Sequence, residues 1–295
     1  SSADSCYSVV YINGAEQERN FATWYSFYRH RQLATSSAAN LAFYTMPDNV
    51  RLTWGTLNTC RIGTNSTSSN CSNNKMARFN GQHRANFYNW LAKLPASGGT
   101  PLNAAMTRAG NFLETHADAY KDESGNSYAC RASYHVLMTD GIYSGNSSGN
   151  KDNTQTDLPD GKTYTPRAPY SDSNTGSLAD NAFYYWSRDL RSGLDNNVPS
   201  YMPVQSGNEN NDYWDPRNNP ATWQHMVNFT VGLGLSRSLT SSSAPTWDPD
   251  ASSPTFAYMS ELLNMGSGGK SWPGTGTSDG KVYDLWHAAI NSRGE

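Results

Sequence analysis

The sequence lacks a basic block, a long apolar run and any CxxC pair. Its 22 Lys and Arg residues are scattered and the net charge over 295 residues is −3, so no stretch is suited to binding nucleic-acid phosphates. No apolar run approaches the ~20 residues that a membrane-spanning helix needs. The start at Ser1 also shows no charged or apolar region of a signal peptide. We expect no nucleic acid partner, no membrane span, and a mature or trimmed N-terminus.

Aromatic and small polar residues are abundant, whereas only 16% of residues are charged, a mixture typical of extracellular bacterial proteins. The four cysteines fit no zinc motif, which indicates disulfides in an oxidising compartment. Cys60 and Cys71 flank a short polar loop and are the easiest pair to join, which leaves Cys6 with Cys130. Three connectivities remain open, as do four buried free thiols.

Apolar periodicity predicts helices that alternate with short strands. We expect helices at 21–28, 87–94, 102–113, 179–190 and 282–289, and strands at 7–12, 50–54, 134–139 and 226–234. This order predicts a single α/β domain over residues 1–295, with a mostly parallel, Rossmann-type sheet flanked by helices. Residues 1–17 form its N-terminal strand and lead-in, and polar segments 141–177 and 196–220 are long loop insertions.

Two polar residues follow predicted elements of this sheet. Thr100 stands between two glycines and Pro101, in the position of an N-cap, and Asp140 directly follows the strand at 134–139. Ligands of open α/β sheets bind at the carboxyl ends of strands, and a hydroxyl with a carboxylate suits Mg²⁺ or Ca²⁺. The simpler alternative is that Thr100 only caps its helix and Asp140 only caps a turn.

Several segments are similar to those of known proteins. Residues 97–102 (SGGTPL) and 137–141 (LMTDG) resemble the second and third loops of the metal-ion-dependent adhesion site in von Willebrand factor A (vWA) domains. A wider match, from about residue 18 to 294, resembles the N-terminal region of the PilC/PilY family of type IV pilus tip proteins. It is carried by residues 18–29 (ERNFATWYSFYR), 177–180 (SLAD), 184–186 (YYW), 223–226 (WQHM), 229–234 (FTVGLG) and 284–291 (DLWHAAIN).

This resemblance implies a vWA-like domain with a non-enzymatic role in pilus assembly, adhesion and surface sensing. It implies minor pilins and other pilus tip proteins as partners, together with a host or surface ligand. The location that it implies is the pilus tip, outside the cell, after export through the periplasm and outer membrane. It also implies a C-terminal β-propeller, which this chain does not contain and which is expected to begin where the chain ends.

One part of the vWA pattern is missing from these 295 residues. The first metal loop, Asp-x-Ser-x-Ser after a central strand, is not found and would lie upstream of Ser1. Only Thr100 and Asp140 carry over as metal ligands, so we expect an incomplete Mg²⁺ or Ca²⁺ site that binds weakly. We also expect an unpaired sheet edge, filled either by residues 7–12 or by a separate upstream segment.

Three functions compete at this point. The first is partner binding at the metal edge, with insertions 141–177 and 196–220 as the recognition surface. The second is a metal-free scaffold that bears force in the pilus tip through its disulfides. The third is a secreted serine hydrolase, because residues 145–149 (GNSSG) match the G-x-S-x-G pattern around Ser147, although they lie in a polar loop.

Other residues have simpler interpretations. His135 and His287 stand among apolar residues and are expected to be hydrogen-bonded in the core, where Trp24, Tyr25 and Trp186 are expected to pack. The loop aromatics are instead hypothesised to be exposed anchors for a partner: Tyr143, Tyr164, Tyr170 and Trp214.

Charged and polar residues of the first insertion also have a simple interpretation. Asp152, Asp157 and Asp160 lack EF-hand spacing and are expected in a solvated acidic loop. Ser177 and Asp180 have the spacing of a capping box, which predicts the start of a helix.

Overall fold

The structure, a computed structural model, describes residues 8–62, 71–95, 97–139, 142–202, 212–235, 238–246, 261–262, 265 and 269–294. Its longer helices are α1 (Ala15–Phe27), α2 (Arg31–Tyr44), α3 (Gly81–Leu91), α4 (Leu102–Thr115), α5 (Leu178–Trp186) and α8 (Ser278–Asn291). Its strands are β1 (Arg51–Leu52), β2 (Ala77–Arg78), β3 (Ser133–Thr139), β4 (Thr156–Asp157), β5 (Thr163–Tyr164) and β6 (Met226–Gly232). This order confirms a mixed α/β fold, whereas within the described ranges three two-stranded sheets replace the larger predicted sheet.

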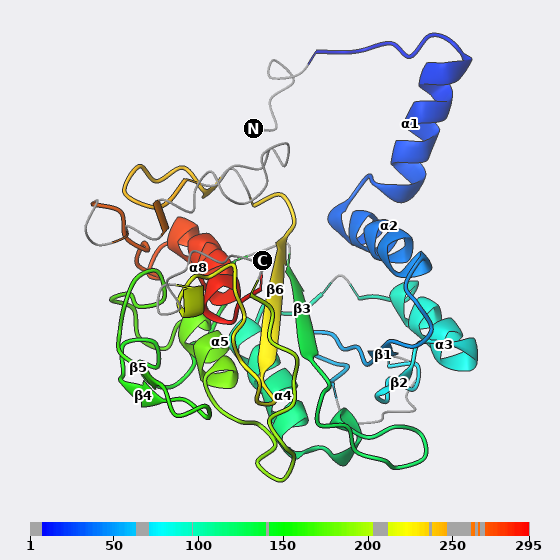
Figure 1. Ribbon diagram of the computed structural model, residues 1–295. Coiled ribbons are helices and arrows are strands. Elements are labelled where there is room, and N and C mark those ends of the chain that lie inside the picture. The colour runs from blue at the N-terminus through cyan, green and yellow to red at the C-terminus, as the bar shows by residue number, and fades with distance from the viewer. Residues whose placement is uncertain are drawn as a thin grey trace.

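Strands β3 and β6 form a parallel pair at the centre of the protein (Figure 1). All seven residues of β3 are in register with the seven of β6. Helices α4, α5 and α8 pack against the pair, and the core that they share includes Leu102, Met106, Leu137, Leu178, Met226 and Leu285. Tyr134 and Val136 of β3 nevertheless remain 66% and 55% exposed. Parallel sheets are normally covered on both faces, so the face of β3 that carries Tyr134 and Val136 lacks the usual cover.

The first insertion is a packed part of the body. Tyr143, Tyr164 and Tyr170 are each at most 3% exposed, and Trp214 packs at the margin of the same core as a partly buried side chain. The prediction that these aromatics are exposed anchors is therefore wrong. A buried aromatic side chain removes about 150–250 Å² of surface from water. Burial of these rings therefore stabilises the packing of the polar insertion against α5 and α8. Trp186 of α5 is fully buried beside them, as predicted.

The N-terminal arm, residues 15–91, has a small core of its own. Phe79, Phe87 and Trp90 pack around Trp54 between α2, α3 and the β1–β2 pair. Helix α1 contributes no buried residue and projects from the rest of the protein (Figure 1). The prediction that Trp24 and Tyr25 lie in the core is wrong: they are 49% and 52% exposed, because in the described part of the chain α1 packs mainly on α2.

Two strand predictions need correction in the same arm. Residues 8–12, which belong to the expected strand at 7–12, have no strand structure and make no ladder with another described segment. In the expected strand at 50–54, only Arg51 and Leu52 pair, and their partner is β2. A strand forms only where a neighbouring segment can hydrogen-bond its backbone N–H and C=O groups. The alternation of apolar residues within a segment does not show whether such a neighbour exists. No helix of the described ranges has the length and apolarity to cross a membrane.

Candidate functional site

Thr100 lies in the turn that leads into α4. Its carbonyl oxygen accepts a hydrogen bond from the N–H of Leu102 (3.0 Å), and Pro101 between them has φ −82° and ψ 67°. These values describe an inverse γ-turn, which moves the start of the helix to Leu102 and makes Pro101 the N-cap residue. The prediction that the Thr100 side chain caps α4 is therefore wrong. Its hydroxyl makes no hydrogen bond within the described part of the chain.

The segment that follows β3 lies directly beside this turn. Asp140 and Gly141 fall outside the described residues, but β3 ends at Thr139 and the chain is described again from Ile142. The N–H of Ser144 donates to the carbonyl oxygen of Thr100 (3.0 Å). The Thr100 turn and the segment after Asp140 thus meet at the carboxyl end of β3. The pairing of their side chains around a cation stays a prediction, and the described residues contain no group of three or more His, Cys, Asp or Glu suited to a metal.

A buried carboxylate of α8 holds the same segment in place. Asp284 accepts hydrogen bonds from the N–H groups of Leu178 (2.8 Å) and Ala179 (3.1 Å) and from the hydroxyl of Tyr143. It therefore caps the first turn of α5 from a neighbouring helix, where the free N–H groups favour a negative charge. Burial raises the pKa of Asp284 and that of Tyr143. Lys281 adds a hydrogen bond from Nζ to the carbonyl oxygen of Tyr143 (2.9 Å).

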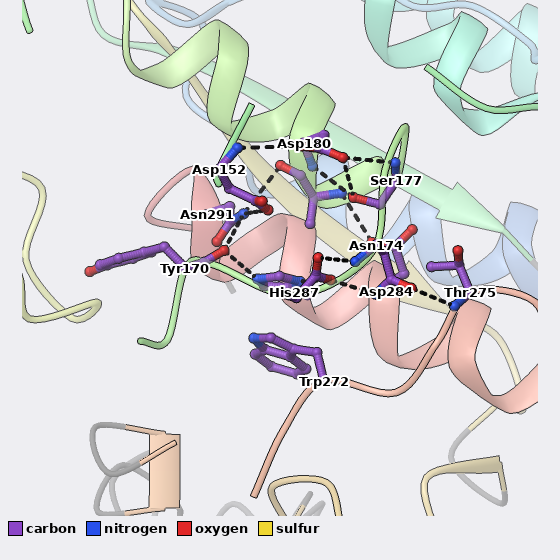
Figure 2. Close-up of polar contacts among 12 residues, drawn as sticks. Asp152, Tyr170, Asn174, Ser177, Asp180, Trp272, Thr275, Asp284, His287 and Asn291 are labelled. Atoms are coloured by element: carbon purple, nitrogen blue, oxygen red, sulfur yellow. Dashed lines mark hydrogen bonds and ion pairs between the residues drawn. The ribbon is translucent and has the colours of Figure 1, made fainter. Parts of the chain in front are cut away.

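A buried polar cluster joins the first insertion to α5 and α8 (Figure 2). Ser177 and Asp180 form the capping box that their spacing predicts, with the Asp180 N–H donating to Ser177 Oγ at 3.0 Å. Asp180 also accepts from the N–H groups of Lys151 and Asp152, so it binds the insertion as well as its own helix. The side chain therefore connects two segments of chain that lie 28 residues apart.

His287 of α8 forms an ion pair inside this cluster. Its Nδ1 lies 3.3 Å from Asp172 Oδ2, its Nε2 is 2.8 Å from the Tyr170 carbonyl oxygen, and its ring stacks on Trp272 with centroids 4.3 Å apart. Burial opposes protonation, but the interaction with the Asp172 carboxylate outweighs it and raises the pKa of His287. Burial of Asp172 is likewise outweighed by its bond with His287, which lowers the pKa of Asp172. His287 is thus a hydrogen-bonded core histidine, as predicted. The sequence did not predict its ion pair with Asp172.

Asp152 has a different state in the same cluster. It is fully buried, and its Oδ2 accepts a hydrogen bond from Asn291 Nδ2 (2.9 Å), whereas Oδ1 has no partner among the described residues. Burial raises the pKa of Asp152 to about 8, so the carboxyl is mostly protonated at neutral pH. The prediction of a solvated acidic loop is wrong for this residue. Asp157 and Asp160 are exposed and bind Thr163 and Tyr213 instead.

Ser147 has a structural role in this part of the fold. It lies in the loop between β3 and β4, where its hydroxyl donates to the Ser177 carbonyl oxygen (3.0 Å) and its N–H to the Gly176 carbonyl oxygen (2.8 Å). A nucleophile of the G-x-S-x-G type sits on a tight turn from a strand into a helix. The loop of Ser147 is not such a turn, so the geometry does not favour a serine hydrolase.

One disulfide joins Cys60 and Cys71, with Cα atoms 5.2 Å apart, which is the pairing that the sequence favours. The carbonyl oxygen of Cys71 accepts from Trp54 Nε1 (2.9 Å), so the bridge is tied to the core of the arm. Cys130 is exposed. Cys6, its expected partner, lies outside the described residues, and this second disulfide stays a prediction.

Three curated proteins of Pseudomonas aeruginosa are similar to the chain over its whole length. The chain is 58% identical over 299 residues to the type IV pilus biogenesis factor PilY1 of strain UCBPP-PA14, and 50% identical over 303 residues to that of strain PAK. Identity to the PilY1 of strain ATCC 15692 is 48% over 304 residues. The chain belongs to the PilC/PilY family.

The family membership confirms the resemblance carried by the six segments quoted above. Each alignment covers 99–100% of the chain but 25% of the relative, so the chain spans about a quarter of the length of these PilY1 proteins. No family model and no solved structure matches the chain.

Proposed function

We propose that this chain is a vWA-like, non-enzymatic domain that binds other proteins in type IV pilus biogenesis. The names of its PilY1 relatives support the pilus role. The observation that carries the binding role is the hydrogen bond between Ser144 and Thr100, which brings two loops together at the carboxyl end of β3. In open α/β sheets that end of the strands is where ligands bind.

The chemistry proposed for this edge is coordination of a divalent cation. The hydroxyl of Thr100 and the carboxylate of Asp140 are hard oxygen ligands of the kind that Mg²⁺ and Ca²⁺ prefer. The Thr100 oxygen suits this role because no described group occupies it. A bound cation would supply an open coordination position for a carboxylate of the partner protein. Because two ligands are few, further protein ligands from the longer polypeptide are part of the proposal.

The partners in this proposal are minor pilins and other pilus tip proteins, a host or surface ligand, and other parts of the same protein such as a C-terminal β-propeller. The proposed place is the pilus tip, outside the cell, after export through the periplasm and outer membrane. Adhesion and surface sensing follow from partner binding at that place. The disulfide between Cys60 and Cys71 supports an oxidising compartment.

The test is substitution of the two proposed ligands in the full-length protein. Asp140→Asn and Thr100→Val should each weaken binding of a minor pilin at least about tenfold, and a chelator should weaken binding of the unaltered protein to the same level. Asp195→Asn is the matched control, because Asp195 is an exposed aspartate far along the chain from both loops. Binding that both substitutions and the chelator leave unchanged would contradict the cation-dependent function.

A metal-free scaffold is the second candidate, and one observation favours it. The buried network around Asp180 and Asp284 and the disulfide between Cys60 and Cys71 provide a rigid framework that needs no cation. Titration with Mg²⁺ or Ca²⁺ distinguishes the two. A cation bound at 100 times its Kd stabilises the folded state by about 2.7 kcal/mol and must raise the melting temperature. An unchanged melting temperature at millimolar cation favours the scaffold.

A further inference from the structure

A polar cavity of about 500 Å³ lies on the N-terminal arm, where α3 begins. Its volume is within the range of ligand sites, about 300–1,000 Å³. Among the described residues that line it, only Ala77 is apolar. Such a lining is suited to a polar ligand, because polar groups that lose water need hydrogen-bond partners. The lining includes Lys75, Arg78, Asn80, Gln82, His83 and Asn86.

The start of α3 presents free backbone donors at this cavity. Asn80 is the N-cap residue, but its side chain makes no capping hydrogen bond. The first backbone bond of the helix runs from the N–H of Arg84 to the Asn80 carbonyl oxygen (3.1 Å). The N–H groups of residues 81–83 therefore have no acceptor in the described part of the chain. Free N–H groups at a helix start favour an anionic group of a ligand.

The charged residues of the lining leave one positive charge in excess. They are Lys75, Arg78 and Glu123 among the residues that the structure describes. Glu123 is already engaged, because its carboxylate accepts from the N–H of Arg78 (3.1 Å) and lies 3.3 Å from Arg78 Nε. Lys75 is exposed and has no hydrogen bond or ion pair with a described residue. The lining thus matches a ligand with one negative charge.

His83 adds a buried acceptor without a partner. The residue is 8% exposed, and its Nε2 lies 2.8 Å from the Leu52 carbonyl oxygen. A carbonyl oxygen only accepts, so Nε2 carries the hydrogen and Nδ1 is an acceptor in the neutral ring. Burial lowers the pKa of His83, which keeps the ring neutral at pH 7. Nδ1 has no hydrogen-bond partner among the described residues, whereas buried polar atoms almost always have one. A hydroxyl of a ligand in the cavity supplies the missing donor.

Two amide side chains on the same helix provide further polar groups. Gln82 Nε2 donates to Asn86 Oδ1 (2.9 Å). This bond leaves the Gln82 carbonyl oxygen as an acceptor and the Asn86 amino group as a donor for a ligand. A hydroxyl both donates and accepts, so hydroxyls match this mixed pair better than a group that only accepts.

We propose that this cavity binds an acidic sugar, a ring that carries one carboxylate and several hydroxyls. The carboxylate lies at the start of α3, where the free N–H groups and Lys75 favour a negative charge. The hydroxyls bind the amides of Gln82 and Asn86 and donate to His83 Nδ1. The proposal does not depend on the cation at Thr100, because Thr100 and Asp140 do not line this cavity.

Two other classes of anion match the lining less well. A phosphate group carries about two negative charges, whereas the lining has one positive charge in excess. A carboxylate without hydroxyls matches the charge but has no donor for His83 Nδ1. An acidic sugar satisfies both requirements.

The class of ligand is tested by saturation-transfer NMR on the full-length protein. Glucuronate, galacturonate and N-acetylneuraminate are the probes, and at least one should bind about tenfold more tightly than glucose, which lacks the carboxylate, and cyclohexanecarboxylate, which lacks the hydroxyls. Binding of none of the three overturns the proposal, as does equal binding of either comparison compound. Tighter binding of inorganic phosphate, measured by displacement, also overturns it and identifies a phosphate site instead.

Substitutions in the full-length protein test the place of binding. Lys75→Met should weaken binding of the best probe about tenfold. His83→Gln keeps an N–H that can bond the Leu52 carbonyl oxygen but removes Nδ1, and should also weaken binding. Lys93→Met, the matched control at the exposed far end of α3, should have no effect. Affinity that Lys75→Met leaves unchanged overturns the proposal even if His83→Gln fails to fold.

A chelator separates this site from the proposed cation site. Removal of divalent cations should leave binding of the sugar probe unchanged, whatever it does to binding of a minor pilin. Loss of sugar binding on chelation would place the sugar at a cation and overturn the assignment to α3.

Discussion

His287 and Asp172, at the centre of the buried cluster, respond to pH in opposite directions. The pKa of His287 is raised, so its contribution to stability is full below its ordinary value of 6.5 and is lost as pH rises through the folded value. The pKa of Asp172 is lowered, so its contribution is full above 3.8 and is lost as pH falls through the folded value. The ion pair therefore stabilises the fold most between about pH 4 and 6.5.

Asp152 lowers the stability of the fold above this pH range. Its pKa rises from 3.8 to about 8 on folding, so the fold prefers the protonated carboxyl and loses stability as pH rises between these values. Asp152→Asn keeps the shape and removes the charge. We expect it to increase the free energy of unfolding by about 1–3 kcal/mol at pH 8 and by less at pH 5, as measured by urea denaturation. Asp157→Asn, an exposed control, should change neither value, and an equal effect of Asp152→Asn at both pH values would contradict the protonated state.

At the scale of elements, one carboxylate joins two helices and a loop. Asp284 of α8 binds the first N–H groups of α5 and the hydroxyl of Tyr143, so its removal leaves three buried donors without a partner. We expect Asp284→Ala to lower the free energy of unfolding by at least about 3 kcal/mol, since each of the three buried unsatisfied donors costs about 1–3 kcal/mol. Thermal or urea denaturation measures the loss.

The matched control is Asp279→Ala on the same helix. Asp279 is exposed in the first turn of α8, where a carboxylate contributes about 0.3–1 kcal/mol through the helix dipole. A loss at Asp284 no larger than the loss at Asp279 would show that α5 does not depend on this contact.

Local sequence signals predicted the positions of the helices and strands better than the long-range contacts that these elements make. The helical spacing of apolar residues in α4, α5 and α8 and the apolar runs of β3 and β6 are properties of short segments, and all five elements form where they were expected. The capping box at Ser177 was predicted for the same reason. Asp172 and Asn291 gave no such signal, because their roles depend on segments more than 100 residues apart in the chain. The aromatics of α1 had the spacing of a buried face, but spacing alone does not supply the surface that buries it.

For the Thr100 site, the sequence predicted where the two loops lie but not the local conformation of the turn. A glycine pair before Thr100 and an apolar run before Asp140 placed both at the carboxyl end of strands, and the bond from Ser144 to Thr100 brings their loops together. The inverse γ-turn at Pro101 escaped prediction because helix start signals do not distinguish one residue from the next. Family membership, in contrast, followed directly from the aromatic and Trp-His segments near the two ends of the chain.

The whole molecule has two parts, an arm and a body, and each has a core of its own. The arm has its core around Trp54, the body has its cores around the β3–β6 pair and the aromatic cluster, and an apolar cavity lies between them. Leu57, Ile62 and Met76 of the arm are only partly buried where they pack against the body core, so we expect the arm and the body to open as separate cooperative units. The disulfide belongs to the arm alone, through the bond from Trp54 to the Cys71 carbonyl oxygen.

Removal of the disulfide tests this division. In the 295-residue chain, Cys60→Ser with Cys71→Ser should destabilise the arm by about 2–4 kcal/mol, because the bridge closes a loop of 11 residues. Hydrogen exchange should then accelerate in α3 and leave α5 and α8 unchanged, since those helices draw their stability from Asp284, His287 and the aromatic core. Cys130→Ser is the control for loss of a thiol, because Cys130 is exposed. Faster exchange in α8 as well would mean that the arm supports the body and that the two parts fold as one.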